Sequence, residues 1–457
     1  MKFVNRTLEL KRLRNTTSSE TATLSVIYGR RRSGKSRLIR ELLAENDIYF
    51  MADQSEMTRQ IELFSEQLGR IIQGFDQLNY SNWEVLFENL NYRIKKGTVI
   101  CMDEFPYLVK NSPELPSILQ KIWDKKEELN YHLILCGSSQ QLMHGMVMDA
   151  SAPLYGRADE ILKINPMMPK NLQQAIGTKA RDTITEYSIW GGIPRYWELR
   201  AQEKNLWDAL NRHVLTSQGI LYNEPVHLFL DDMRDTVHSF TLLSVIASGS
   251  KRLSEIAARM EKPATHLSAP LDKLIQLGYI EREMPFGENI KKSKKSFYKI
   301  SDPFLDFYFT FVVPNRSLIE IEKSNTVKSL ILKKMPIYVS AHWEEICRKA
   351  VPFLNIDQIQ FKPASRWWGK VDKNTEIELD VVAESVDKKY ILVGECKWNE
   401  KEINEDELLN KLIRKTERLP FVKEREIIPV LFLKSTQSEK AENIFRPEEI
   451  IDFYVAQ

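Results

Sequence analysis

A glycine-rich segment that follows an apolar run constrains the fold of this chain more than any other feature. Residues Gly29–Ser36 read GRRRSGKS and match the pattern G-x-x-x-x-G-K-[ST] in full. The apolar segment Leu24–Gly29 precedes this motif, and the helix-like segment RLIRELLAE follows it. A strand, a glycine-rich loop and a helix in this order are the context that a phosphate-binding loop requires. They predict an α/β domain built on a parallel sheet.

We expect this loop to bind ATP together with Mg²⁺. Backbone N–H groups of the loop would surround the β-phosphate, Lys35 would reach the β- and γ-phosphate oxygens, and the Ser36 oxygen would ligate Mg²⁺. The residues expected to contact the nucleotide are Gly29, Arg30, Arg31, Arg32, Ser33, Gly34, Lys35, Ser36 and Arg37. The alternative, a chance glycine-rich turn, is disfavoured by the flanking strand and helix.

Further strand-like segments at residues 48–53, 98–104 and 132–139 would complete the sheet. The second of them ends in Asp103, which would hold the Mg²⁺ shell, and Glu104, which would orient and activate the attacking water. The third ends in Ser138 and Ser139. These serines, Ser138 first, would hydrogen-bond the γ-phosphate or its water, although a helix N-cap explains serines at this place equally well.

Length and composition limit the remaining possibilities. A chain of 457 residues with 43% hydrophobic content predicts about three domains, which we place at 1–192, 193–316 and 317–457. No uncharged apolar run approaches the roughly 18 residues of a membrane span, and the charged N-terminus does not resemble a signal peptide. We therefore expect a cytoplasmic protein without a membrane partner. Four isolated cysteines predict neither a zinc site nor disulfides.

These motifs resemble the archaeal-type ATPase family, a relative of the STAND and origin-recognition branches of the AAA+ ATPases. The opening Phe3–Leu10 is similar to the motif F-x-G-R-x-x-E-L, with Asn5 in place of the glycine. Residues Leu154–Arg157 are similar to L-Y-G-R, and Gly191–Pro194 to G-G-x-P. The resemblance implies that Arg6 lies on the adenine side of the nucleotide.

The same resemblance suggests two further nucleotide contacts. Arg157 is our candidate for a γ-phosphate-sensing cation, because a guanidinium neutralises charge that develops during phosphoryl transfer. It would act in its own chain or on a neighbouring subunit of a homo-oligomer, and a surface salt bridge is the alternative. Pro194 would pack near the adenine, although ordinary loop chemistry also explains it.

The middle module is mostly helical and resembles a winged helix-turn-helix. Its second helix would carry Leu267, Leu271, Leu274 and Leu277 on one face. The segment Gly287–Ile300 would form a basic wing with Lys291, Lys292, Lys294, Lys295 and Lys299. Such a wing suggests DNA as a partner through phosphate contacts. The alternatives are a lid or relay without DNA contact, or a solvated hairpin.

The last module carries two carboxylates and an ammonium group on two strand-like segments. Asp380 lies on the first, and Glu395 and Lys397 lie on one face of the second, with Cys396 turned into the core. The spacing allows a hairpin that brings these groups together. Asp380 and Glu395 would bind Mg²⁺, while Lys397 would position water or stabilise the transition state. Glu378 shares the face of Asp380 and is an alternative ligand.

This module resembles the PD-(D/E)xK restriction-endonuclease-like fold that accompanies archaeal-type ATPases. Residues Arg366–Gly369 match an R-W-W-G stretch, and the resemblance implies that Glu344 supplies another metal-binding carboxylate. We therefore expect an ATP-binding, ATP-hydrolysing switch coupled to a Mg²⁺-dependent DNA nuclease-like domain. The alternative is a nucleotide-switched DNA-binding or protein-interaction regulator with an inactive nuclease fold. A small-molecule kinase fits less well, because no acceptor-site motif is apparent.

Overall fold

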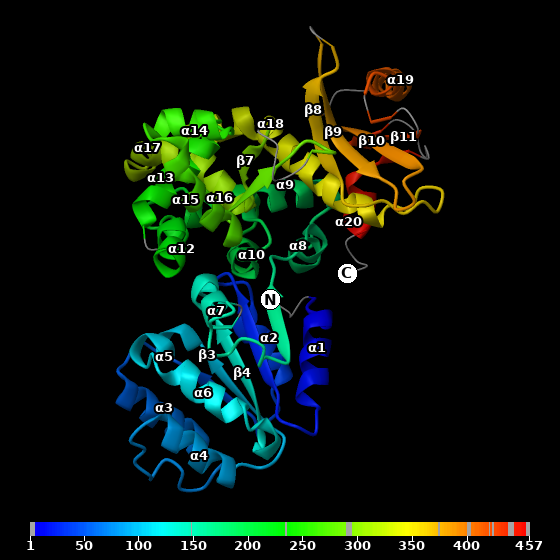
Figure 1. The fold of residues 1–457 in the computed structure, drawn as a ribbon. Helices are drawn as coiled ribbons and strands as arrows, with labels where there is room; N and C mark the ends of the chain where they lie inside the picture. The colour runs from blue at the N-terminus through cyan, green and yellow to red at the C-terminus, as the bar shows by residue number, and fades with distance from the viewer. Residues whose placement is uncertain are drawn as a thin grey trace. The chain divides into compact units, whose positions relative to one another are not determined.

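The computed structural model describes residues 5–147, 149–233, 235–288, 295–372, 375–399, 404–419, 421–422, 425–436 and 443–453 (Figure 1). The chain divides into two compact units. Unit 1 comprises Met1–Pro166, Ile193–Arg195 and Leu230–Asp232, and unit 2 comprises Met167–Gly192, Tyr196–Phe229 and Met233–Gln457. Across the described residues, no helix combines the length and the apolar character that a membrane crossing demands.

Unit 1 is built on a five-stranded parallel sheet; the sequence predicted a parallel sheet with four of these strands. Its strands are β1 (Leu24–Gly29), β2 (Ile48–Met51), β3 (Thr98–Asp103), β4 (Tyr131–Gly137) and β5 (Glu160–Ile164). The order across the sheet is β2-β3-β4-β1-β5, and every printed pairing is parallel. The strand β5 was not predicted. The strands β3, β4 and β1 lie next to one another in this order and run parallel. Their carboxyl ends therefore meet beside the glycine-rich loop.

Helices cover both faces of this sheet. They are α1 (Thr7–Thr17), α2 (Lys35–Leu42), α3 (Met57–Gly69), α4 (Trp83–Arg93), α5 (Phe105–Asn111), α6 (Leu115–Trp123) and α7 (Gln140–Val147). Leu13 of α1 and Ile39 of α2 pack with Ile27 on one face. Phe64 of α3 and Trp83 of α4 belong to the core on the other face, with Val26. Neighbouring residues of β1 thus point into different cores, which explains its continuous apolar run.

Unit 2 combines helical and mixed-sheet parts. Its elements before the C-terminal sheet are α8 (Pro169–Ile176), α9 (Ala180–Trp190), α10 (Pro194–Ala201, whose first residues belong to unit 1), α11 (Leu206–His213), α12 (Glu224–Asp232, whose end belongs to unit 1), α13 (Thr236–Ala247), α14 (Leu253–Met260), α15 (Ala264–Gln276), β6 (Ile280–Glu283), β7 (Phe297–Ile300), α16 (Pro303–Phe307), α17 (Arg316–Glu320) and α18 (Ser324–Ala350). Residues 167–192 join this unit because α9 packs against α16 and α18. The predicted first domain, residues 1–192, thus includes a segment, Met167–Gly192, that belongs to unit 2.

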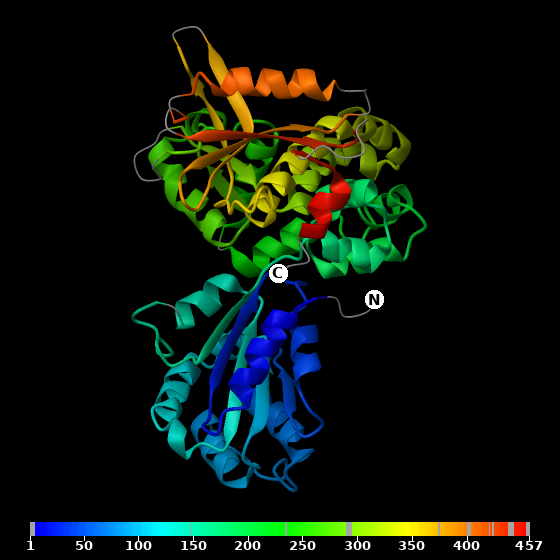
Figure 2. The same cartoon turned by 90° about the vertical axis from the view of Figure 1, so that its right-hand side faces the viewer.

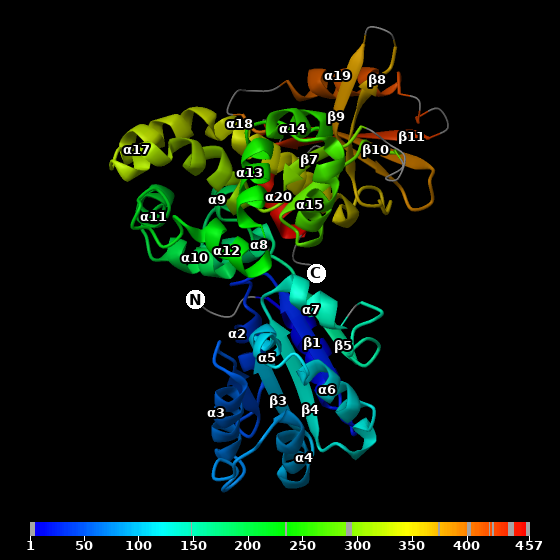
Figure 3. The same ribbon diagram turned by 60° about the vertical axis from the view of Figure 1, so that its left-hand side comes forward.

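Three helices followed by a hairpin form the middle of unit 2, in the order of a winged helix-turn-helix. Helices α13, α14 and α15 pack together, and β6 pairs antiparallel with β7 (Figure 3). The four leucines predicted to share one face of α15 and its end are buried, namely Leu267, Leu271, Leu274 and Leu277. Of the predicted wing lysines, Lys291, Lys292 and Lys294 lie outside the described residues.

The C-terminal part contains a mixed five-stranded sheet. Its elements are β8 (Ser365–Lys370), β9 (Glu376–Glu384), β10 (Tyr390–Lys397), α19 (Glu405–Thr416), β11 (Glu426–Leu433), β12 (Ile444–Phe445) and α20 (Pro447–Phe453). The order is β12-β11-β10-β9-β8, with β9 antiparallel to both β8 and β10. The helices α18 and α19, yellow and orange in Figure 2, cover opposite faces of this sheet. The predicted hairpin that joins β9 to β10 is confirmed.

Candidate functional site

The glycine-rich loop joins β1 to α2 through conformations that require glycine. A Cβ atom on Gly29 would lie 2.6 Å from the carbonyl oxygen of Ile164 on the neighbouring strand β5. Gly34 has a φ of +93°, which L side chains rarely adopt. The buried Lys35 donates from Nζ to the carbonyl oxygens of Gly29 at 2.9 Å and Arg30 at 3.0 Å. The loop therefore holds its ammonium group inside its own turn, at the N-terminus of α2.

Oxygen ligands suited to Mg²⁺ meet next to this loop. Ser36 Oγ donates to Asp103 Oδ2 at 2.7 Å, so the two residues that the sequence assigned to Mg²⁺ lie side by side. Hydroxyl and carboxylate oxygens are the ligands that Mg²⁺ prefers, and one or two protein ligands suffice beside phosphate and water. The pair fits a Mg²⁺ ion held between the loop and a bound phosphate.

Tyr49 is a neighbour of this pair that the sequence did not reveal. Its hydroxyl donates to Asp103 Oδ2 at 2.5 Å, from the neighbouring strand β2. Burial alone would raise the pKa of Asp103, but hydrogen bonds from Tyr49, Cys136 and Ser36 outweigh it and lower that pKa. Burial and the Asp103 carboxylate raise the pKa of Tyr49 itself. Tyr49 thus keeps Asp103 ionised and oriented, as a supporting partner of a metal ligand does.

Replacing Tyr49 with phenylalanine tests this supporting role. The variant keeps the ring but loses the hydrogen bond to Asp103, so the Mg²⁺ concentration for half-maximal ATP hydrolysis should rise about 10-fold. Tyr92→Phe is the matched control, because that side chain is 89% exposed on α4. The measurement is a Mg²⁺ titration of steady-state ATP turnover. An unchanged midpoint in Tyr49→Phe would contradict the assignment.

Glu104 lies at the end of β3 in a geometry suited to holding water. Its backbone adopts a left-handed conformation with φ 55°, and its N–H donates to Asp103 Oδ1 at 2.9 Å. The Glu104 carboxylate accepts from Ser138 Oγ at 2.9 Å, and Ser138 N lies 3.4 Å from the same oxygen. Ser138 therefore meets Glu104 at the ends of adjacent strands. The helix-cap alternative applies to Ser139 instead, whose Oγ accepts from Leu142 N at 3.5 Å.

Arg6 and Pro194 both lie beside the glycine-rich loop. Arg6 is buried, and its Nη2 donates to the carbonyl oxygens of Asn165 at 2.6 Å and Ser33 at 3.3 Å. Its observed role is therefore to support the loop backbone. Pro194 Cγ lies 3.9 Å from the position of a Cβ on Gly34. Nucleotide contacts of these residues, and of Arg30, Arg31, Arg32, Ser33 and Arg37, stay predictions.

Arg157 does not lie at the nucleotide loop of its own chain. Its Nε donates to Oδ1 of Asp124 at 2.8 Å, and Asp124 is the residue directly after α6. Arg157 itself lies three residues before the start of β5. Next to it, Asp159 Oδ2 accepts from the N–H of Leu24, the first residue of β1. Arg157 thus lies at the amino ends of the strands, whereas the loop lies at their carboxyl ends, about 20 Å away by strand length. This corrects the prediction of action within one chain and leaves only action on a neighbouring subunit as a prediction.

The Asp380, Glu395 and Lys397 side chains come from two paired strands of unit 2. The β9–β10 register aligns Val381 with Gly394, so Asp380 and Glu395 are the next residues along the two strands. Asp380 Oδ2 accepts from the N–H of Cys396 at 2.9 Å. On its other side, β9 pairs with β8, and the register shifts next to Asp380. Ser365 pairs with Val382 and Trp367 with Leu379, so β9 has one more residue than β8 between these pairs. Such a bulge re-aims a side chain, and bulges are frequent next to active sites.

Two ammonium groups surround the second carboxylate. Lys397 Nζ lies 2.6 Å from Glu395 Oε1, and Lys415 Nζ on α19 lies 3.2 Å from Oε2. Burial would raise the pKa of Glu395, but these lysines outweigh it and lower that pKa. Burial and the charge of Glu395 raise the pKa of Asp380. The sequence did not reveal Lys415, because it lies on the separate helix α19 and no motif links that helix to β10.

The predicted set of three carboxylate ligands is not formed. Within the parts of the chain that the structure describes, no group of three His, Cys, Asp or Glu side chains is arranged to hold a metal ion. Burial, together with the nearby Asp380, raises the pKa of Glu344 to about 7. Glu344 also lies 3.8 Å from Arg348 Nη1, so a cation already shares its carboxylate. The residues that still fit Mg²⁺ are Asp380 and Glu395, since Mg²⁺ is often bound through one or two carboxylates.

Glu378 does not replace Asp380. Its side chain is 55% exposed and forms an ion pair with Arg366. Asp380 is the more buried of the two, and it is hydrogen-bonded to β10. The alternative ligand that the sequence left open is therefore exposed and paired with an arginine, whereas Asp380 is held against β10.

Comparisons with known proteins agree with the geometry of unit 1. Residues 3–199 match the model of an ATPase domain predominantly from Archaea, and residues 308–409 match a family of archaeal and bacterial proteins of unknown function. The chain is 30% identical over 406 residues to the uncharacterized protein MJECL04 of Methanocaldococcus jannaschii, covering 87% of this chain and 88% of the relative. A shorter match of 66 residues, 42% identical, covers 14% of this chain and 64% of the M. jannaschii protein MJ0424.

Among solved structures, the Walker-type ATPase PABY2304 of Pyrococcus abyssi is similar, with a TM-score of 0.51 and 21% identity over 67% of this chain and 96% of that one. This likeness concerns the fold. It agrees with the five-stranded parallel sheet and the glycine-rich loop between β1 and α2. The chain therefore belongs to the family of the M. jannaschii protein MJECL04 and carries the P-loop ATPase domain found predominantly in Archaea.

Proposed function

We propose that this protein hydrolyses ATP and that its nucleotide state controls a Mg²⁺-dependent DNA-cleaving site in unit 2. The observation that carries the proposal is the continuous polar chain that runs from Ser36 through Asp103 and Glu104 to Ser138. A protein that only binds nucleotide needs the loop and a metal ligand. A carboxylate held next to them by a neighbouring strand is what hydrolysis adds.

Each residue has one task in the proposed hydrolysis. The loop backbone and Lys35 bind the phosphates, and Ser36 and Asp103 would hold Mg²⁺, which neutralises charge on the phosphate oxygens. Glu104 accepts a hydrogen bond from the attacking water and orients it toward the γ-phosphorus. Ser138 keeps the Glu104 carboxylate in place through its hydroxyl. The water oxygen bonds to the γ-phosphorus, the bond between that phosphorus and the oxygen bridging to the β-phosphate breaks so that ADP leaves, and the water proton passes to the Glu104 carboxylate.

For unit 2 we propose cleavage of a phosphodiester bond in DNA. Asp380 and Glu395 would hold Mg²⁺, and Lys397 would stabilise the charge that develops on the phosphate. DNA would reach unit 2 through the helices α14 and α15. Exposed basic residues in α14 and in the segments next to it are Lys251, Arg252, Arg259 and Lys262. Arg252 pairs with Glu255 at 4.0 Å, and Arg259 donates to Ser248 Oγ at 2.6 Å. In the hairpin, Lys299 pairs with Glu281 and Lys295 with Glu288, so carboxylates of the protein already neutralise the described wing lysines.

One observation favours the second candidate, a nucleotide-switched regulator that binds DNA or protein without cutting. Both oxygens of Glu395 are engaged by Lys397 and Lys415, and a site closed in this way does not bind metal until the lysines move. A nuclease must open this arrangement when substrate arrives. A regulator keeps it closed, because inactive versions of an enzyme fold serve as binding modules.

The deciding experiment uses the full chain and its Lys35→Ala variant. ATP affinity is measured first, and then Mg²⁺-dependent cleavage of plasmid and single-stranded DNA with and without ATP. Lys35→Ala should weaken ATP binding about 100-fold, since charge-assisted hydrogen bonds to the phosphates are lost. Lys11→Ala, on the exposed side of α1, is the control and should bind like the wild type.

Each outcome has a distinct meaning. ATP-dependent cleavage that disappears in Lys35→Ala supports the proposed coupling. DNA binding that depends on ATP without any cleavage would transfer support to the regulator. Wild-type ATP affinity in Lys35→Ala would contradict the assignment of the loop.

A further inference from the structure

The hairpin β6–β7 forms a separate two-stranded sheet that packs against the C-terminal sheet of unit 2. The N–H of Phe286, just after β6, donates to the carbonyl oxygen of Arg366 on β8 at 2.7 Å. The ring of Phe286 lies 5.3 Å from that of Phe421 and packs against the C-terminal core. Phe297 of β7 stacks on Trp368 of β8 with ring centroids 4.6 Å apart. The hairpin is therefore tied to the strand that borders β9.

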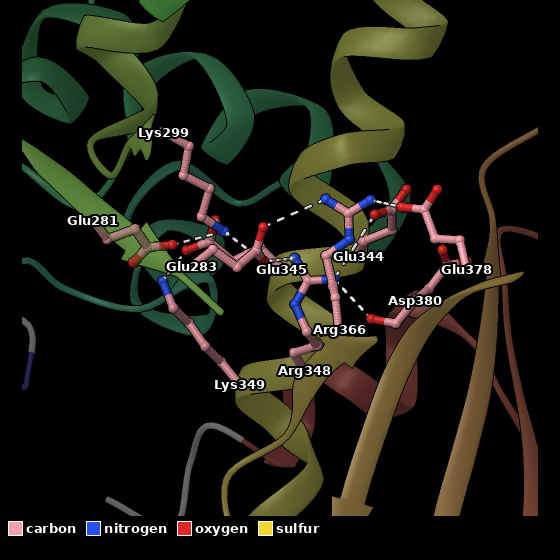
Figure 4. A network of polar contacts seen from close by, with 10 residues as sticks. All are labelled: Glu281, Glu283, Lys299, Glu344, Glu345, Arg348, Lys349, Arg366, Glu378 and Asp380. Carbon is pink, nitrogen blue, oxygen red and sulfur yellow. Dashed lines mark hydrogen bonds and ion pairs between the residues drawn. The ribbon is translucent and has the colours of Figure 1, made fainter. Parts of the chain in front are cut away.

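A buried ion-pair network accompanies this packing (Figure 4). Glu283, the last residue of β6, has a side chain only 12% exposed. One of its oxygens lies 3.6 Å from Arg348 Nη2, and the other lies 3.4 Å from Arg366 Nη1. Lys299 of β7 approaches the first oxygen at 3.5 Å. One carboxylate of the hairpin thus binds an arginine of α18 and an arginine of β8.

Both arginines also contact β9, which carries Asp380 of the candidate site. Arg348 Nη1 donates to the carbonyl oxygen of Asp380 at 2.8 Å and lies 3.8 Å from Glu344 Oε2. Arg366 pairs with Glu378, two residues before Asp380 (Figure 4). Glu283 is therefore one side chain away from the backbone that carries Asp380. Buried charges of this kind depend strongly on each partner, because removal of one leaves the others unpaired in a poorly solvated region.

We propose that Glu283 is a positioning residue through which the hairpin β6–β7 sets the geometry of the Asp380–Glu395–Lys397 site. Displacement of the hairpin removes the anion that holds Arg348 and Arg366. The two guanidinium groups then shift toward Glu344 and Glu378, and the bulge that aims Asp380 loses its support. An open cleft of about 760 Å³, lined by Glu283, Lys299 and Arg348 among others, borders the hairpin at this network.

The hairpin, together with the helices α13–α15 that precede it, would then regulate the Asp380–Glu395–Lys397 site. This regulation deepens the proposed function and rests on it where cleavage is concerned. The physical link itself does not depend on cleavage, because it concerns the order of the β9–β10 backbone. The experiment therefore measures backbone protection and cleavage separately.

Hydrogen exchange with mass spectrometry on the full chain tests the link. Glu283→Gln should speed exchange in the peptides that carry β9 and β10, including the Cys396 N–H bonded to Asp380, about 5-fold or more. Glu281→Gln is the matched control. It lies on the same strand and contacts Lys299 at 2.6 Å but neither arginine, and its side chain is 40% exposed. Exchange there should stay at the wild-type rate.

Cleavage provides the second readout. Glu283→Gln should raise the Mg²⁺ concentration for half-maximal cleavage about 10-fold while the rate at saturating Mg²⁺ changes little. Glu283→Asp keeps the charge and should restore part of the wild-type midpoint. General loss of structure would instead lower the rate at every Mg²⁺ concentration, and a thermal melt of each variant identifies it.

The failures are distinguishable. Unchanged β9–β10 exchange in Glu283→Gln, or the same acceleration in Glu281→Gln, overturns the link whether or not DNA is cut. A wild-type chain that does not cleave DNA overturns the proposed nuclease, while accelerated exchange confined to Glu283→Gln still supports the link. Should Glu283→Gln unfold, exchange in Glu283→Asp decides, because its shorter side chain reaches the two arginines less well: faster exchange confined to β9 and β10 supports the link, and exchange equal to wild type throughout overturns it.

Discussion

Replacing Glu104 with glutamine is expected to lower kcat for ATP hydrolysis by about 10²–10⁴-fold while ATP binding is retained. Glutamine is nearly the same size and still accepts a hydrogen bond from Ser138, so the local structure should persist. It cannot polarise the attacking water as a carboxylate does. The loop, Lys35 and the Ser36–Asp103 pair remain intact, so binding should be unaffected. Steady-state turnover and equilibrium nucleotide binding measure the two properties separately.

The control for this variant is Glu114→Gln. Glu114 is an exposed glutamate just before α6 and lies on the same connection between β3 and β4. Its replacement should leave both binding and turnover unchanged. Turnover by Glu104→Gln at the wild-type rate would show that another group orients the water. A loss of ATP binding in the same variant would show that Glu104 supports the loop and not the chemistry.

Local patterns predicted most of unit 1, because the elements that form its site follow one another in sequence. The glycine-rich motif contains its own strand, loop and helix, and Asp103 and Glu104 follow directly on a buried strand. In a parallel sheet the carboxyl ends of the strands meet at one edge, so Ser138 could be expected to face Glu104. The structure agrees with that expectation, with 2.9 Å between the Ser138 hydroxyl and the Glu104 carboxylate.

The errors come from contacts that depend on elements with weaker patterns. The strand β5 has only five residues and lies at the sheet edge, and its apolar residues are interrupted by Lys163. Without β5, the sequence did not show that Arg157 precedes a strand and therefore lies at the edge opposite the loop. Tyr49 was missed for a related reason. Its hydroxyl meets Asp103 across the sheet, and nothing within β2 distinguishes it from a packing residue.

In unit 2 the sequence predicted the strand pair but not the charges around it. The spacing of Asp380 and Glu395 predicted a hairpin, and β9 pairs with β10. Lys415 on α19 and the arginines that bind Glu283 approach from separate elements. These groups decide whether the carboxylates are free to bind a metal ion, which explains why the predicted ligand set was too large. The hairpin read as a basic wing is, in its described part, an ion-paired two-stranded sheet that packs against the C-terminal sheet.

Asp380→Asn is expected to reduce Mg²⁺-dependent DNA cleavage by about 10²–10³-fold, because it removes one of the two carboxylates that fit the metal ion. Asparagine keeps the size of the side chain, and its amide oxygen still accepts from the Cys396 N–H, so the β9–β10 pairing should persist. ATP hydrolysis depends on residues of unit 1 and is measured in the same preparations. It should retain its wild-type rate, which separates a defect at the site from a loss of fold.

Glu378→Gln is the decisive companion, since both residues lie on β9 and only their surroundings differ. Asp380 contacts β10 beside Glu395 and Lys397, whereas Glu378 is 55% exposed and paired with Arg366. An exposed ion pair contributes little, and a mildly altered Arg366 should change cleavage less than about 5-fold. Equal losses in both variants would mean that the charge of the strand, and not a metal site at Asp380, supports cleavage. A large loss confined to Asp380→Asn would locate the chemistry at Asp380, where β9 bulges against β8 and where a bulge can re-aim a side chain.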